Sequence, residues 1–135
     1  MRIKENEILY LYNSNLLFDR QNLGYLLSLK DHVIKDVDVK EDTISEQQLK
    51  NIAYKLNVSV DKMIDTKSME YRNMVKEKDL DEEDVLTAIK KNPNLLRTPI
   101  AIYKDKAFLV NSAYDFVNHD MAVSGITPNH RDSDD

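Results

Sequence analysis

The chain of 135 residues has the length of one domain, with 41% hydrophobic and 32% charged residues, as in ordinary soluble globular proteins. Its net charge of −5 argues against direct nucleic-acid binding, which depends on neutralising phosphates. Cysteine is absent, which excludes a thiol nucleophile and thiolate metal sites within these residues, and two glycines are too few for a Gly-rich phosphate loop. No apolar run approaches the roughly 20 residues that span a bilayer. We therefore expect a cytoplasmic protein without cofactor, nucleic-acid contact or membrane contact.

The N-terminal part predicts a strand–helix–strand unit. Residues 8–12 are apolar and β-prone, an Asn-Ser-Asn turn follows, and residues 16–30 have apolar positions near helical spacing. Residues 32–39 predict a second strand, with valines at alternate positions for part of its length. Because a helix connects the two strands, they should be parallel.

The next segment, about residues 44–91, predicts a run of helices. A capping-box spacing at Ser45 begins the first helix, which ends at Asn57, and Asp81 can cap the last. Two shorter helices are expected between these two, over residues 60–64, with Ser59 as a possible cap, and 68–77.

The C-terminal part is organised around residues 92–102. Asn92 stands where a left-handed residue commonly ends a helix, and Pro93 prevents the preceding helix from continuing. A β-hairpin begins directly after Pro99, and a short helix is expected after it. We predict a single domain over residues 1–120 and a disordered tail over residues 121–135.

This arrangement resembles the arsenate reductase (ArsC)/Spx family, a glutaredoxin-like branch of the thioredoxin fold. The resemblance rests on Asn-Pro-x-Leu-Leu at residues 92–96, on Thr66-Lys67 followed by Glu70-Tyr71-Arg72, and on the order β-α-β, helical insertion, β-β-α. It covers about residues 7–118. It implies an α/β fold with a thioredoxin-like mixed sheet, in which Pro99 is a cis-proline beside the active site.

The resemblance also implies an active-site loop after the first strand, and there the sequence departs from the family. When the chain is aligned on Asn13 and Arg20, Leu16 takes the place of the nucleophilic cysteine, and Asp19 that of the second cysteine of Spx-type members. Leucine has no lone pair with which to attack arsenic or sulfur. Asn13 and Arg20 match the family, but a turn residue and a solvated helix residue explain them equally well.

The two arginines that bind the oxyanion in the family are also missing. Their positions hold Asp65 and Thr98, while Arg97 lies one residue too early and should point to the opposite face. Asp19 and Asp65 would repel an oxyanion rather than bind it. For Asp65, a helix-terminal or turn role is the alternative.

Two hypotheses concern Leu16, Leu17 and Phe18, which stand where the family presents its thiol. In the first, at least one of these side chains is exposed and anchors a protein partner within a polar rim. The residues of that rim would be Asn13, Asn15, Asp19 and Arg20. In the second, Leu16 folds back and fills the vacated pocket against Pro99.

Other chemistry has weaker support. His32, His119 and His130 are far apart in the sequence and predict structural or surface roles rather than a metal site. Helix capping explains the acidic residues at 81–84, and a solvent-facing strand edge explains those at 36 and 38. We interpret the remaining candidates for a cofactor box as core residues: Met69, Tyr71 and Met74.

Two classes of function remain open. The first is a pseudoenzyme, a non-catalytic module that binds or regulates a protein; since Spx-type relatives dock on RNA polymerase, the resemblance suggests that partner. The second is an arsenate reductase of the family's glutathione- and glutaredoxin-linked type. The absence of cysteine favours the first class, and the sequence gives neither a partner nor an oligomeric state.

Overall fold

The fold is built on a four-stranded mixed sheet, which a computed structural model describes over residues 6–29, 32–74 and 80–118. The strand order is β2-β1-β3-β4. The strands are β1 (Glu7–Tyr12), β2 (Val33–Asp38), β3 (Ile100–Tyr103) and β4 (Lys106–Leu109). β1 pairs in parallel with β2 and antiparallel with β3, and β3 pairs antiparallel with β4. The parallel β1–β2 pair joined by a helix confirms the predicted strand–helix–strand unit.

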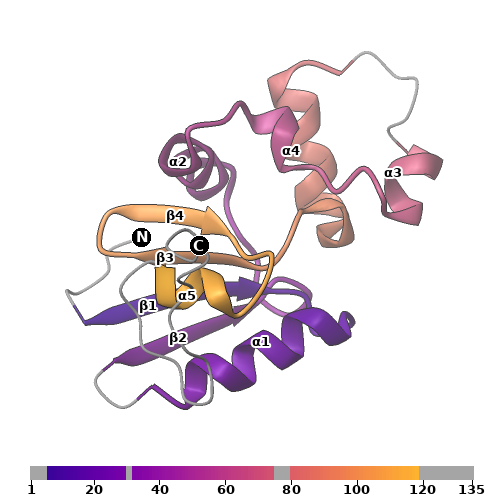
Figure 1. The fold of residues 1–135 in the computed structure, drawn as a ribbon. Coiled ribbons are helices and arrows are strands. Elements are labelled where there is room, and N and C mark those ends of the chain that lie inside the picture. The colour runs from indigo at the N-terminus through magenta and orange to yellow at the C-terminus, as the bar shows by residue number, and fades with distance from the viewer. Residues whose placement is uncertain (1–5, 30–31, 75–79, 119–135) are drawn as a thin grey trace, which may run out of the picture.

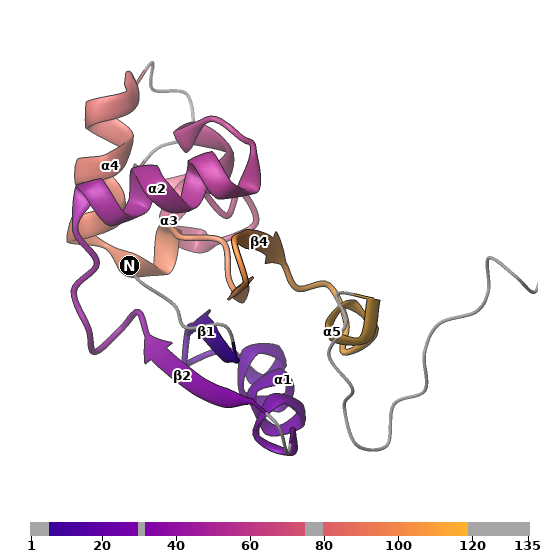
Figure 2. The same ribbon diagram turned by 90° about the vertical axis from the view of Figure 1, so that its left-hand side faces the viewer.

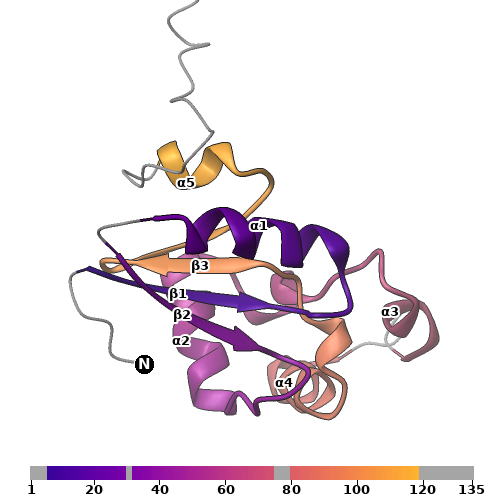
Figure 3. The same cartoon turned by 90° about the horizontal axis from the view of Figure 1, so that it is seen from below.

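Helices cover both faces of this sheet (Figures 1 and 3). On one face lie α1 (Leu17–Leu27) and α5 (Tyr114–Asn118), and on the other α2 (Glu46–Leu56) and α4 (Glu82–Lys91). Figure 2 shows the same separation from the side. Beyond the end of the sheet lies α3 (Met69–Met74), and two 3₁₀ turns complete the helical segment, η1 (Val60–Met63) and η2 (Pro93–Leu95). This is the predicted α/β, thioredoxin-like arrangement.

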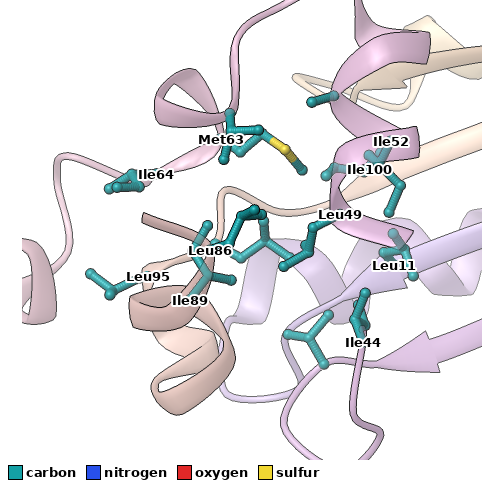
Figure 4. Close-up of a cluster of buried hydrophobic side chains, with 14 of the residues drawn as sticks. Leu11, Ile44, Leu49, Ile52, Met63, Ile64, Leu86, Ile89, Leu95 and Ile100 are labelled. Atoms are coloured by element: carbon teal, nitrogen blue, oxygen red, sulfur yellow. The ribbon is translucent and has the colours of Figure 1, made fainter. Parts of the chain in front are cut away.

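Two hydrophobic cores form because alternate residues of β1 point to opposite faces of the sheet. Leu9 and Leu11 belong to the larger core, under α2 and α4, and Ile8 and Tyr10 belong to the smaller core, on the side of α1 and α5. Figure 4 shows the larger core, where side chains from the helical segment meet those of β1 and β3. The helical segment is therefore packed on the sheet.

The starts of two long helices follow their local sequence. Ser45 before α2 and Asp81 before α4 each form a complete capping box with the residue three positions later. The end of α2 is also as predicted, since Asn57 adopts a left-handed conformation with φ 61°. The left-handed prediction for Asn92 is wrong: its φ is −138°, and Pro93 directly begins η2.

Some predictions for the helical segment need correction. Met69 is 64% exposed and does not fill the core, whereas Tyr71 is partly buried and packs against the larger core. The Ser59 hydroxyl donates to the Asp61 carboxylate instead of capping η1. The side chain of Met74 and the predicted tail over residues 121–135 lie outside the described residues, and the single-domain assignment stays a prediction.

Candidate functional site

The loop between β1 and α1 presents three apolar side chains at the tip of the helix. Leu16 is the N-cap residue of α1 and is 41% exposed, while Leu17 is 60% and Phe18 is 42% exposed. We call Leu16, Leu17 and Phe18 the apolar tip. The structure thus contradicts the hypothesis that Leu16 folds back as a plug, because nearly half of its surface is accessible.

Asp19, directly after the apolar tip, turns inward. It is only 1% exposed, and its Oδ2 accepts a hydrogen bond of 2.9 Å from the backbone N–H of Asn13. The Tyr10 hydroxyl donates to the backbone carbonyl of Asp19 at 2.8 Å, so this first turn of α1 is fixed to β1. Asn13 is also buried, at 3% exposure. The prediction that Asn13 and Asp19 belong to an exposed polar rim is therefore wrong, whereas Asn15 and Arg20 are exposed.

The charge on Asp19 is electrostatically unfavourable. Burial raises the pKa of its carboxyl above the usual range, and the nearby Asp65 carboxylate raises it further. The Thr98 hydroxyl and the Asn13 N–H lower the pKa of Asp19 without outweighing burial. The fold thus brings together three of the positions at which the sequence departs from the family, Asp19, Asp65 and Thr98.

The segment before β3 completes this side of the site. The peptide bond between Thr98 and Pro99 is cis, and Pro99 is buried. The backbone carbonyl of Pro99 accepts a hydrogen bond of 3.0 Å from Val110, which joins the start of β3 to the end of the hairpin. Arg97 is exposed and donates to the backbone carbonyl of Lys62, so it does not replace the missing arginine at 98.

Asn13 links the loop to the helical segment. Its Nδ2 donates to Asn94 Oδ1 at 2.8 Å, and Asn94 Nδ2 donates to Glu70 Oε2 at 3.2 Å. Its Oδ1 also accepts from the N–H of Asn15, as in an ordinary turn. Asn13 is therefore a turn residue and a structural bridge. Asn94 and Glu70 were not predicted to belong to the site, although both lie within the motifs that carry the resemblance.

The side chains of Arg20 and Asp65 both form hydrogen bonds with nearby backbone groups. The Arg20 Nη1 donates to the Ser14 carbonyl at 2.7 Å and so supports the loop from the solvent side. Asp65 Oδ1 accepts from the N–H of Lys67 at 3.0 Å, the turn role weighed for it. Arg20 is therefore directed to the backbone rather than to an oxyanion, and Asp65 is a turn residue.

Further carboxylates gather on the β2 side of the loop. Asp38 Oδ1 accepts from the N–H groups of Ser14 (3.2 Å) and Lys40 (3.1 Å). Partial burial favours a higher pKa for Asp38, but these hydrogen bonds outweigh it and the pKa is lowered, so Asp38 carries its charge. Tyr12, opposite Asp38 in the β1–β2 register, has its pKa raised by burial and by Asp36, Asp38 and Asp42. The apolar tip therefore has negative charge beside it.

The described residues do not form a metal-binding site. No group of three or more His, Asp or Glu side chains in the described ranges is arranged to hold a metal ion. His32 lies 3.1 Å from the Tyr103 hydroxyl and packs on its ring, a structural role, while His119 and His130 lie outside the described residues. Among the described helices, none has the length and apolar character needed to cross a membrane.

Comparison with known proteins identifies the class of fold. An arsenate reductase from Vibrio cholerae superposes with a TM-score of 0.74 at 17% identity, covering 85% of this chain and 98% of that one. A Yersinia pestis protein, provisionally assigned as an arsenate reductase, also gives a TM-score of 0.74, at 20% identity, covering 82% of this chain and 98% of that one. The chain thus has the thioredoxin-like fold of arsenate reductases. No curated protein sequence matches it significantly.

A family match narrows this assignment. Residues 50–110, which include Asp65, Thr98 and Pro99, match the sequence model of the ArsC family. Residues 50–110 therefore resemble the ArsC family, within a chain that has the fold of arsenate reductases and no cysteine in its 135 residues. The matched segment does not reach the loop with Leu16 and Asp19, whose alignment with the family's cysteines stays a prediction.

Proposed function

We propose that this chain is a non-catalytic ArsC-like module, a pseudoenzyme that binds a protein partner through the apolar tip. The observation that carries the proposal is the exposure of Leu16 within a group of exposed apolar side chains, at the position that the resemblance assigns to the nucleophile. Isolated apolar residues are common on protein surfaces, whereas a contiguous exposed apolar patch is typical of a binding surface.

The electrostatics of the site support the same proposal. Asp19 and Asp65 lie close enough to raise the pKa of Asp19, where the family's chemistry calls for positive charge. Arsenate carries negative charge near neutral pH, so these carboxylates oppose its binding. Asn13 and Arg20, which match the family, instead hold the loop together.

An activity assay tests the catalytic side of the proposal. Arsenate reduction coupled to glutathione and glutaredoxin should remain at the buffer background with the 135-residue chain. The Leu16→Cys variant should also stay at background, because the site still lacks positive charge for the anion. Turnover by the wild-type chain would refute the pseudoenzyme and favour the alternative, a reductase that uses an unrecognised group.

A matched pair of variants tests the binding side. Leu17 and Leu27 are both leucines of α1 and both 60% exposed, at opposite ends of the helix. Each Leu→Ser change should alter stability by less than about 0.5 kcal/mol, as surface changes usually do. Proteins captured from a cell extract by the wild-type chain should be retained by Leu27→Ser and lost by Leu17→Ser. Equal capture by all three chains would exclude the apolar tip as the anchor. RNA polymerase, the partner suggested by the resemblance to Spx, would be identified among captured proteins by mass spectrometry.

A further inference from the structure

We propose that the apolar tip binds a protein segment in which an apolar side chain stands next to a lysine or arginine. This inference rests on the proposed binding function and adds the chemistry of the partner. It follows from the charges around the apolar tip, which differ in sign from those that an oxyanion site requires.

Carboxylates contact or act on the residues that flank the apolar tip in the chain, on both sides. On the β2 side, Asp38 accepts a hydrogen bond from Ser14, two residues before the apolar tip begins. Asp36 and Asp42 act together with Asp38 on the neighbouring Tyr12, which places all three in one group. On the side of the helical segment, Asp65 acts electrostatically on Asp19, which directly follows the apolar tip.

The positive groups on the β2 side are fewer than the carboxylates there. Arg20 is directed to the Ser14 carbonyl, and Lys40 lies beside Asp38. Lys67 follows Asp65 in its turn. On the β2 side, the three carboxylates that act on Tyr12 (Asp36, Asp38, Asp42) therefore outnumber Arg20 and Lys40, whereas on the other side Lys67 and Arg97 lie on the segments beside Asp65.

An apolar anchor with carboxylates on both sides favours a particular kind of ligand. An apolar side chain of the partner can pack on Leu17 and Phe18, and a neighbouring ammonium or guanidinium group can reach Asp38 or Asp65. An acidic segment would meet repulsion from the same carboxylates, so the surface discriminates by charge as well as by apolar contact.

Selection from random peptides displayed on phage tests this directly, with the wild-type chain as bait. We expect the selected peptides to be enriched in lysine or arginine next to an apolar residue, and to bind Leu27→Ser as well as the wild type. Binding of a synthetic selected peptide should be lost in Leu17→Ser. It should weaken by about two- to fivefold in Asp38→Asn or Asp65→Asn, the range for a partly exposed ion pair, and further with added salt. Asparagine retains the Oδ1 acceptor at both positions, so unchanged circular dichroism and urea midpoints should show that the variants are folded.

Several results would overturn the inference: acidic or uncharged selected peptides, equal binding by Leu17→Ser, no enrichment at all, or self-association of the chain through the apolar tip in sedimentation experiments. These outcomes are separate from a failure of the proposed function. If the chain reduces arsenate, the non-catalytic module is refuted whatever peptides are selected. If a partner captured through Leu17 engages it with an acidic segment, the module stands and the basic partner is refuted.

Discussion

Asp19 offers the sharpest test of the site, because two substitutions separate its hydrogen bond from its charge. Asp19→Ala removes the acceptor of the Asn13 N–H in a place that is 1% exposed. Leaving a buried donor without a partner costs about 1–3 kcal/mol, so this variant should lose stability by that amount. Asp19→Asn keeps an acceptor for Asn13, can donate to the Thr98 hydroxyl, and removes the buried charge.

The pH dependence carries the electrostatic part of this prediction. Because the pKa of Asp19 is raised in the folded protein, the folded state holds a proton that an unfolded aspartate, with a pKa of about 3.9, has released. The resulting stability is present below about pH 4 and is lost as the pH rises through the folded-state pKa. The stability of Asp19→Asn relative to the wild type should therefore increase over that window.

Urea unfolding followed by circular dichroism or tyrosine fluorescence, from about pH 4 to about pH 8, measures both effects; the chain has seven tyrosines and no tryptophan. Other acids, such as Asp38, contribute to the slope of each curve, so the difference between wild type and Asp19→Asn is the quantity to use. If the free energy of unfolding changed with pH in the same way for these two proteins, and if Asp19→Ala were as stable as the wild type, Asp19 would be solvated. The inference that its carboxyl is buried and hydrogen-bonded would then be refuted.

Three further predictions concern the scaffold and the loop. Ser45→Ala should lower the free energy of unfolding by about 0.5–2 kcal/mol, since it removes a side-chain acceptor of the α2 capping box; no loss in urea titrations would contradict that cap. Leu86→Ala, at a position with 0% exposure, should cost about 2–5 kcal/mol in the same assay, whereas Leu27→Ala should stay within about 0.5 kcal/mol. Similar losses for the two would argue against the packing of α4 on the sheet. Asn94→Ala should leave the unfolding midpoint little changed but increase amide hydrogen exchange in the loop at 13–15, because Asn13 loses its link to Glu70; unchanged exchange would contradict that link.

The sequence was most informative where structure is decided locally. Capping boxes at Ser45 and Asp81 involve residues three positions apart, and they place the starts of α2 and α4 correctly. The end of α4 was less predictable, because Pro93 starts a new turn at once and draws Asn92 away from a left-handed conformation. Met69 shows the limit of spacing arguments: helical periodicity identifies a face, but the packing of a six-residue helix decides whether that face is covered.

The candidate site depended on contacts between distant segments, which the sequence pattern could not supply. An aspartate in the first turn of a helix is usually explained by solvent exposure and the helix dipole. Asp19 is buried instead, because its carboxyl reaches back to Asn13 and lies near Thr98, 79 positions later in the chain. With Asp19 turned inward, the exposed part of this turn is left to the apolar side chains before it.

The inward-turned Asp19 also predicts that a cysteine introduced into this loop will not create a thiol–oxyanion site. A helix N-terminus contributes only about 0.3–1 kcal/mol of attraction to an anion, and a nearby like charge at an effective dielectric constant of about 20 repels more strongly than that, so a charge on Asp19 would outweigh the attraction. A thiolate at position 16 would meet the same field, so the pKa of a Leu16→Cys thiol should not be lowered as in a reactive cysteine. The exposed leucine and the buried aspartate are therefore compatible with each other, and each opposes a thiol–oxyanion site in the same loop.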